Sequence, residues 1–206
     1  MARQFPGVPF ERYADDAVAH CATEAQAREV LDAIAQRMAE VGLELHPDKT
    51  RIGKDTDRTG SAEHERFTFL GYTFRPRLSK SRHGHFFVNF SPAVSDDAKK
   101  AIGREIRSWR INCRSDKSLS DLARMFNPIV QGWINYYGRF YKSMLFLVLR
   151  RINEYLVRWA MRKYKRLRGH LTRAVNWLAS VARPEPGLFA HWRVGVRPDG
   201  WTVGAG

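Results

Sequence analysis

The chain has little cysteine, no long apolar run and no apolar leader, and each absence excludes a class of protein. Cys21 and Cys113 are the only cysteines in 206 residues, too few for a disulfide framework or a zinc pattern. The most apolar stretch, Met144 to Leu149, is far too short to span a bilayer. The N-terminus lacks the charged segment and apolar run of a signal peptide. We therefore expect a cytoplasmic protein without a membrane partner.

Acidic residues are scarce in the second part of the chain. Residues 1–60 hold 8 Lys/Arg and 11 Asp/Glu, a net charge of −3, whereas residues 61–206 hold 27 and 10, a net charge of +17. Hydrophobic residues at 44% and aromatic residues at 12% indicate a folded protein. A polyanion is the expected partner of such a basic surface. Nucleic acid is favoured over an anionic membrane, because aromatic residues and glycines interrupt every basic stretch.

Two adjacent carboxylates, Asp15 and Asp16, stand at the expected tip of a β-hairpin. A first strand reaches Tyr13, the chain turns at residues 14–16, and a second strand leaves through residues 17–19. A solvated acidic turn is one interpretation, since Asp is common in turns. Two neighbouring carboxylates repel each other, however, and Mg²⁺ is often held by one or two carboxylates plus substrate phosphates. The tip is therefore a candidate Mg²⁺ site.

A helix and short extended segments are expected after this hairpin. Thr23 and Gln26 have the form of a capping box, and Gly42 is placed to end the amphipathic helix that follows. Residues 43–52 predict short extended segments around a turn at His46-Pro47-Asp48. The polar sequence from Gly53 to Glu65 predicts a surface loop.

A strongly β-prone run extends from Phe67 to Phe74. Its interior Gly71 predicts a bulge or a close approach of another backbone, and Pro76 is expected to end the strand. A basic turn then leads to a return strand over residues 85–90, with the histidines of that turn exposed rather than bound to a metal. The first 90 residues therefore predict an α+β layer.

From residue 91 onward the pattern becomes helical. Ser95 and the two Asp residues after it predict an N-cap and an acidic first turn. Pro128 suits an early helical position, so it is expected near the start of a helix. The tail after residue 184 is aromatic and Gly-rich, with Trp192 and Trp201, and is expected to pack irregularly. Helices are expected over 98–112, 118–126, from 128 through 137, 143–167 and 170–181.

The helix expected over 143–167 carries many cations and a single compensating acid, Glu154. A charge run is usually a solvated face, but the cations here exceed what solubility needs, and backbone phosphate is their natural partner. A-form RNA is recognised by shape and phosphate, which suits such a surface. The candidate RNA-binding residues are Arg150, Arg151, Arg158, Arg162, Lys163, Lys165 and Arg166.

Four motifs, in this order, resemble the C-terminal half of group II intron-encoded reverse transcriptase/maturases. Tyr13-Ala14-Asp15-Asp16 resembles the metal-binding motif of the polymerase palm, and the stretch around Leu43 to Thr50 resembles the next palm motif. Phe69-Leu70-Gly71-Tyr72 is similar to the primer-grip hairpin, and residues 127–137 to the maturase signature. The resemblance implies a partial reverse-transcriptase palm over 1–90, a helical thumb/maturase domain over 91–183 and an irregular tail over 184–206.

The resemblance also implies roles for single residues. Asp15 would bind Mg²⁺ directly with support from Asp16, and Lys49 would hold a phosphate or protonate the leaving pyrophosphate. A solvated turn lysine is the alternative for Lys49, and ordinary packing is the alternative for the aromatic residues. The stripe of Trp133, Tyr136 and Tyr137 is expected in the core rather than as a base-stacking platform. The expected primer and template contacts are Tyr13, Phe69, Leu70, Gly71 and Tyr72.

The partners implied by the resemblance are group II intron RNA, an RNA template, a DNA primer, dNTPs and Mg²⁺. The fingers and the palm strand with a third metal-binding Asp are expected before residue 1, so a separate chain that supplies them is a further expected partner. The predicted function is part of an RNA-directed DNA polymerase that also assists RNA splicing. The alternatives are a non-catalytic RNA-binding maturase module and an inert fragment of a split gene.

Overall fold

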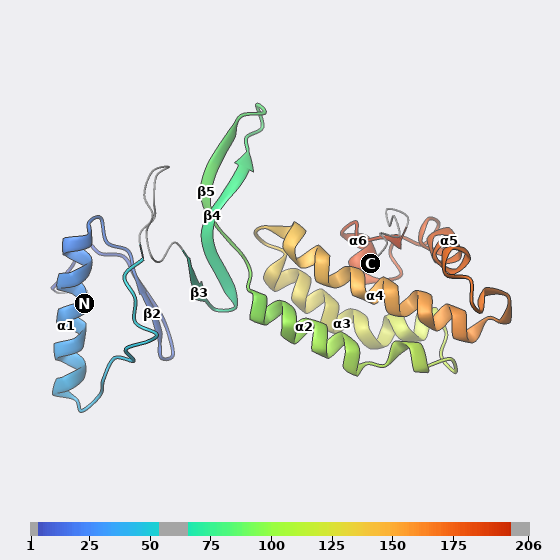
Figure 1. Cartoon of the computed structure of the whole chain (residues 1–206), viewed down its shortest axis with the longest axis horizontal. Helices are drawn as coiled ribbons and strands as arrows, with labels where there is room; N and C mark the ends of the chain where they lie inside the picture. Colours follow the sequence, from blue (N-terminus) through green and yellow to red (C-terminus); the bar gives the residue numbers. More distant parts are fainter. Residues whose placement is uncertain (1–3, 54–65, 199–206) are drawn as a thin grey trace. The chain divides into compact units, whose positions relative to one another are not determined.

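The computed structural model describes residues 4–53 and 66–198, which fall into two compact units, Met1–Ser91 and Pro92–Gly206. The predicted α+β class is confirmed, because the first part of the chain contains two small antiparallel sheets and one helix, and the second part is helical (Figure 1). Trp201 and all of the predicted surface loop except Gly53 lie outside the described residues.

The first sheet is a two-stranded hairpin. Strands β1 (Phe10–Tyr13) and β2 (Asp16–Ala19) pair antiparallel, with Tyr13 opposite Asp16. Only Ala14 and Asp15 connect the two strands, so Asp16 belongs to β2 rather than to the turn. The predicted hairpin is otherwise confirmed.

Helix α1 (Glu24–Glu40) has the predicted caps at both ends. The side chain of Thr23 accepts the N–H of Gln26 at 3.1 Å, and the side chain of Gln26 accepts the N–H of Ala22 at 2.7 Å. Gly42 has a φ of +73°, and its N–H and that of Leu43 donate to Ala39 and Met38 carbonyls, which is a Schellman ending. The local signals therefore place both ends of the helix.

The extended segments expected over residues 43–52 do not form regular strands. The chain turns where Lys49 and Thr50 N–H groups donate to the His46 carbonyl, at 3.2 and 2.9 Å, and this turn was predicted. No neighbouring strand pairs with the flanking residues up to Gly53. Without such pairing, the alternating apolar residues Leu43 and Leu45 are not enough to make a strand.

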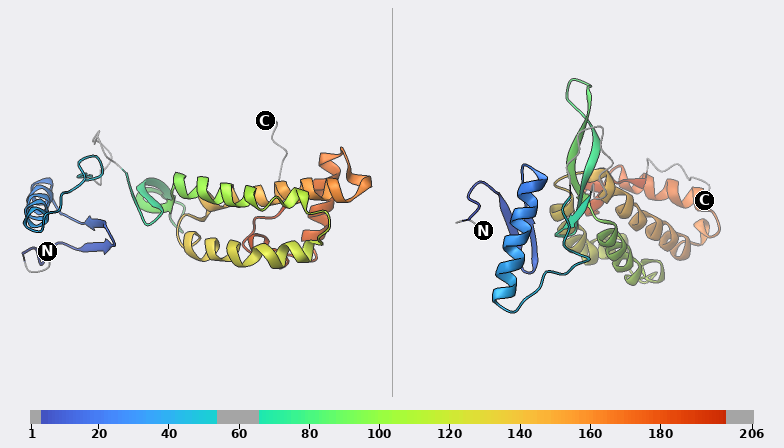
Figure 2. Two further views of the ribbon diagram at one scale, coloured as in Figure 1. Left: turned by 90° about the horizontal axis from the view of Figure 1, so that it is seen from below. Right: turned by 60° about the vertical axis from the view of Figure 1, so that its left-hand side comes forward.

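The second sheet has the order β3-β4-β5, and β4 and β5 are the long pair of green strands in the right-hand view of Figure 2. Strand β3 (Phe67–Phe69) pairs antiparallel with β4 (Tyr72–Lys80), and β5 spans Phe86–Val94. Leu70 and Gly71 form the turn between β3 and β4. Pro76 lies inside β4 and does not end it. The residue pattern alone predicted one strand over Phe67–Phe74, because a turn that begins with Leu resembles the middle of an apolar strand, whereas the family resemblance predicted a hairpin here.

The second unit consists of helices joined by short turns. Ser95 caps α2 as predicted, since its side chain accepts the Ala98 N–H at 3.1 Å. The elements are α2 (Asp96–Ser108), the 3₁₀ turn η1 (Ile111–Cys113), α3 (Leu119–Tyr137), α4 (Lys142–Lys163), the 3₁₀ turn η2 (Lys165–Leu167), α5 (Leu171–Ala182) and α6 (Ala190–Arg193).

Pro128 lies in the middle of α3, so the two helices expected around it are one. A proline inside a helix removes one backbone bond and normally kinks or breaks it. Packing on either side offsets this cost, because the Trp109 ring stacks on Phe126 at 4.4 Å and on Trp133 at 5.5 Å between ring centroids. One indole thus holds the turns before and after the proline.

Two other helices are shorter than predicted. Helix α2 ends at Ser108 because Arg110 adopts a left-handed φ of +50°, which no α-helix continues through. Helix α4 ends at Lys163, and Lys165–Leu167 form the separate turn η2 before Gly169, whose φ is +76°. The cations predicted on one long helix therefore lie on two elements.

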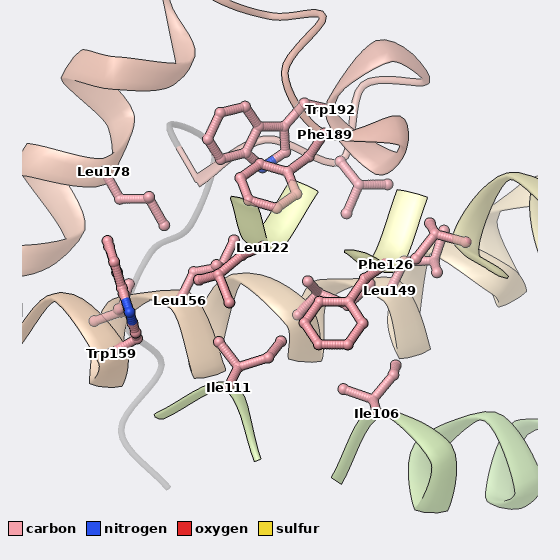
Figure 3. Packing of buried hydrophobic residues seen from close by; sticks show 14 of the residues in the cluster. Ile106, Ile111, Leu122, Phe126, Leu149, Leu156, Trp159, Leu178, Phe189 and Trp192 are labelled. Carbon is pink, nitrogen blue, oxygen red and sulfur yellow. The ribbon is translucent and has the colours of Figure 1, made fainter. Parts of the chain in front are cut away.

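The hydrophobic core belongs to the second unit, where α4 lies beside α2 and α3 (Figure 1). Leu156 and Trp159 of α4 are fully buried and share this core with Ile111 of η1, Leu122 of α3 and Leu178 of α5 (Figure 3). The indole of Trp159 also donates to the Arg114 carbonyl at 2.9 Å. Every helix from α2 to α6 contributes to this one cluster.

The tail after α5 is anchored by two asparagines. Asn127 donates to the Leu188 carbonyl and accepts the Ala190 N–H, both at 2.9 Å. Asn153 is buried, and its Oδ1 accepts the indole N–H of Trp192 at 2.8 Å. The tail thus forms the short helix α6 and buries Phe189 and Trp192, where irregular packing was predicted (Figure 3).

His191 completes this buried network. Its Nε2 lies 2.8 Å from Asn153 Oδ1, and its Nδ1 has no hydrogen-bond partner among the described residues. Because Trp192 can only donate, the shared Asn153 atom is an acceptor, so Nε2 of His191 carries the proton. Burial lowers the pKa of His191 from 6.5 to about 3. The imidazole is therefore neutral across the physiological range.

Candidate functional site

The candidate metal-binding tip is exposed to solvent. Ala14 has a left-handed φ of +52°, which costs a non-glycine residue roughly 1–2 kcal/mol, and Arg12 supports the turn by donating Nε to the Ala14 carbonyl at 3.1 Å. Tyr13 is 64% exposed, and Asp15 and Asp16 are exposed as well. Neither carboxylate forms an ion pair or hydrogen bond with another described residue. Their oxygens are thus available to a cation.

The residue types at the tip would suit part of a magnesium site. Two adjacent carboxylates are the hard oxygen ligands that Mg²⁺ prefers, so the residue types fit the ion. Among residues 4–53 and 66–198, however, no group of three or more His, Cys, Asp or Glu side chains is arranged to hold a metal. Within this part of the chain, Asp15 and Asp16 therefore have no third protein ligand.

Lys49 is exposed on the turn that begins at His46. Its ammonium group forms no ion pair within the described residues. A free exposed ammonium suits a phosphate partner, and it equally suits a solvated lysine. The role of Lys49 stays a prediction.

The β3–β4 hairpin presents a tight two-residue turn. Leu70 and Gly71 both have left-handed φ values, +50° and +76°, as a type I′ turn requires. Gly71 thus serves the turn rather than the predicted bulge. Tyr72 is 8% exposed, and Phe67 stacks on Phe74 with ring centroids 4.7 Å apart. The aromatic residues hold the hairpin together, and the primer contact expected of Phe69–Tyr72 stays a prediction.

The predicted RNA-binding cations are mostly exposed. Arg150, Arg151, Arg158 and Arg162 lie on α4, while Lys165 and Arg166 lie on η2. The Arg151 guanidinium lies against Gly103 of α2, where a larger residue would displace it. The Arg158 guanidinium lies 5.5 Å from the centroid of the Tyr155 ring. These contacts leave most of the guanidinium donors to solvent.

Lys163 differs from the other six because it is half-buried. Its ammonium donates to the carbonyls of Ser115 and Lys117, at 2.9 and 2.7 Å, and lies 5.4 Å from the Trp159 ring centroid. These contacts tie the end of α4 to the loop before α3. Lys163 therefore has a structural role whether or not RNA also contacts it.

Basic residues in the last third of the chain have almost no acidic partners. Residues 125–198 contain 14 Lys/Arg and two acids, Glu154 and Glu185. All of these residues are described, and none of them forms an ion pair with another described residue. The ion pairs of the described chain end at Arg124. The positive charge of this region is therefore not compensated by ion pairs within residues 4–53 and 66–198.

The structure adds Asn112, a residue that the sequence did not single out. Asn112 comes beside the end of α4, where Arg162 Nη1 donates to its carbonyl at 3.3 Å. Arg168 lines the same region after the turn η2. No local spacing connects these residues, since Asn112 and Arg162 are 50 positions apart in the chain. Only the packing of η1 against α4 brings them together.

Comparisons with known proteins match both units of the chain. Residues 1–74 match the family described as reverse transcriptase (RNA-dependent DNA polymerase). Residues 99–177 match the family described as group II intron, maturase-specific domain. A comparison with curated proteins found no match. In the described part of the chain, no helix is both long and apolar enough to cross a membrane.

The two family matches follow each other along the chain, a reverse transcriptase match and then a group II intron maturase match. The chain therefore belongs to the group II intron-encoded reverse transcriptase/maturases.

Proposed function

We propose that the helical unit binds structured group II intron RNA and thereby assists splicing. The observation that carries the proposal is the uncompensated charge of residues 125–198, with 14 Lys/Arg, two acids and no ion pair. Each phosphate that such cations neutralise releases counterions, which drives binding. The rigid core beneath α4 keeps the cations in a fixed pattern, as recognition of A-form RNA by shape requires.

The first unit supplies part of an RNA-directed DNA polymerase site that acts on a DNA primer, an RNA template and dNTPs. Asp15 and Asp16 would hold Mg²⁺, which supplies Lewis-acid activation of the phosphoryl group in nucleotidyl transfer. Tyr13 and the Phe69–Tyr72 turn would position the primer, and Lys49 would contact a phosphate. We assign residues 1–90 to the palm, 91–183 to the thumb/maturase domain and 184–206 to a tail, in a cytoplasmic protein.

A non-catalytic maturase module is the second candidate function. It is favoured by the lack of a third metal ligand near Asp15 and Asp16 within the described residues. In that case the helical unit would bind intron RNA and the acidic tip would have no catalytic part. The two candidates share the RNA-binding surface and differ only at the tip, so separate experiments address them.

RNA binding is tested by fluorescence anisotropy with a labelled intron transcript at several salt concentrations. We expect the affinity to fall steeply with salt, and replacing Arg150 and Arg151 by Gln to lower it about tenfold and to reduce the salt slope. Arg28→Gln is the matched control, because Arg28 is already paired with Glu24 at 2.7 Å in the first unit. Salt-independent binding, or equal losses in the control, would refute the proposal.

Metal binding at the tip is tested with Mn²⁺, which shares the oxygen ligands of Mg²⁺. Mn²⁺ should broaden the backbone NMR signals of Asp15 and Asp16 at low concentration, and Asp15→Asn should abolish this effect without changing RNA affinity. Asp32→Asn, which removes an exposed carboxylate of α1, is the control. Equal broadening in wild type and Asp15→Asn would favour the non-catalytic module.

A further inference from the structure

A pocket lies where the end of α4 meets η1 and the turn after η2. Its volume is about 450 Å³, within the roughly 300–1,000 Å³ of small-ligand sites. Three segments line it: η1 contributes one residue, the last turns of α4 three, and the chain after η2 two. The lining residues are Asn112, Arg158, Met161, Arg162, Arg168 and Gly169.

The charge of this pocket selects an anion. Three of its six lining side chains are arginines and none is acidic, and neither Arg158, Arg162 nor Arg168 forms an ion pair within the described residues. The C-terminal end of a helix carries about half a negative charge, which opposes an anion here. Three full positive charges outweigh it. Arg162 is partly fixed, because its Nη1 donates to the Asn112 carbonyl and contacts Cys113 Sγ, both at 3.3 Å.

A bare phosphate would leave part of the pocket unused. Asn112 is half-buried, and its side-chain amide has no hydrogen-bond partner among the described residues. An amide both donates and accepts, which suits the edge of a nucleobase. Met161 is also half-buried and offers an apolar surface, while guanidinium planes stack on bases. The pocket thus combines groups for a phosphate with groups for a base.

We propose that this pocket binds one unstacked nucleotide of the RNA, with its phosphate on the three guanidinium groups and its base against Met161 and the Asn112 amide. This inference rests on the proposed RNA binding of the helical unit. It adds a specific contact to a surface that otherwise recognises only phosphate, since unpaired bases in bulges and loops are the sites of specific RNA recognition.

The test compares an unbulged RNA hairpin with four hairpins that carry one extra, bulged nucleotide. Each of the four has a different base in the bulge. Anisotropy titrations with the full chain should show at least one bulged hairpin bound about tenfold more tightly than the unbulged one. Asn112→Ala should remove this preference and leave the salt-dependent binding of the unbulged hairpin intact. Arg183→Gln, which removes an exposed cation outside the pocket, should lower the affinity for bulged and unbulged hairpins by the same factor.

The outcomes of this test distinguish the proposed nucleotide pocket from the proposed RNA binding of the helical unit as a whole. Salt-dependent binding without any bulge preference, or a preference that survives Asn112→Ala, would refute the pocket and leave the proposed function standing. Failure to bind either hairpin would refute the proposed function itself. If Asn112→Ala does not fold, Arg168→Gln supplies the same test, because Arg168 is exposed and lies outside the helices.

Discussion

The two units of the chain bury very different amounts of apolar side chain. Among the described residues of the first unit, Val8, Val30 and Tyr72 are the buried hydrophobic side chains, whereas 28 are buried from Ala93 to Val196. The proposed RNA-binding surface of the second unit is therefore built on a core of its own. The Asp15–Asp16 tip has little apolar support within the described residues, so we expect its geometry to become fixed only when its partners bind.

The largest expected effect is the loss of a core side chain in the helical unit. Leu156→Ala should lower the free energy of unfolding by about 2–5 kcal/mol, because Leu156 is fully buried and its removal leaves a cavity. Urea denaturation followed by circular dichroism measures this change. Leu147→Ala is the matched control on the same helix, since Leu147 is 53% exposed and should change stability by no more than about 0.5 kcal/mol.

If both substitutions lowered the free energy of unfolding by similar amounts, the core packed around α4 would be contradicted. The same measurement also tests the difference between the units. Leu156→Ala should leave the backbone NMR signals of α1 unchanged, because the buried cluster contains no residue of the first unit. A simultaneous loss of α1 signals would show that the two units fold together.

The second expected effect is a loss of stability in acid that depends on His191. Burial lowers the pKa of His191 from 6.5 to about 3, so between these values the unfolded chain binds a proton that the folded chain does not. Stability therefore falls as the pH drops below 6.5, by about 2 kcal/mol at pH 5. His191→Gln should remove this part of the pH dependence, since glutamine can donate to Asn153 without titrating.

His170→Gln provides the control, because it removes an exposed histidine that lies just before α5 and outside the buried network. Denaturation midpoints at pH 7, 6 and 5 distinguish the three proteins. An unchanged slope in His191→Gln would mean that the buried imidazole takes up a proton without penalty, which would contradict its neutral state.

Local signals in the sequence predicted helix starts well and long-range packing poorly. Thr23 and Ser95 each cap a helix as expected, and the helix expected from Ser118 begins there, because a helix start depends on residues within one turn. Pro128 misled the prediction, since Trp109 holds the helix on both sides of it. The residue pattern did not reveal the Leu70–Gly71 turn, because Leu rarely adopts a positive φ, and only the family resemblance predicted a hairpin there.

The candidate sites show the same division. The Asp15–Asp16 hairpin could be located from its local pattern, and its register follows from two short strands. The Asn112 pocket and the Asn153 network could not be found, because each joins residues about 40 to 50 positions apart that only the folded core brings together. Local sequence patterns therefore predict many turns and caps, whereas a pocket can be located only once the packing of distant segments is known.

The smallest expected effect compares the N-caps of the two units. Thr23→Ala and Ser118→Ala each remove a cap bond of 3.1 Å and should each lower the free energy of unfolding by about 1 kcal/mol.

Hydrogen bonds from Ser118 hold the pKa of Asp121 below its usual value, so Ser118→Ala should raise that pKa in an NMR titration. The stabilisation that the Asp121 carboxylate adds to this cap is thus present above the ordinary Asp pKa and is lost as the pH falls through the lowered one. Thr23→Ser and Ser118→Thr keep a hydroxyl and should restore both caps. If hydrogen exchange in α1 does not rise about fivefold in Thr23→Ala, α1 is held by contacts other than its cap.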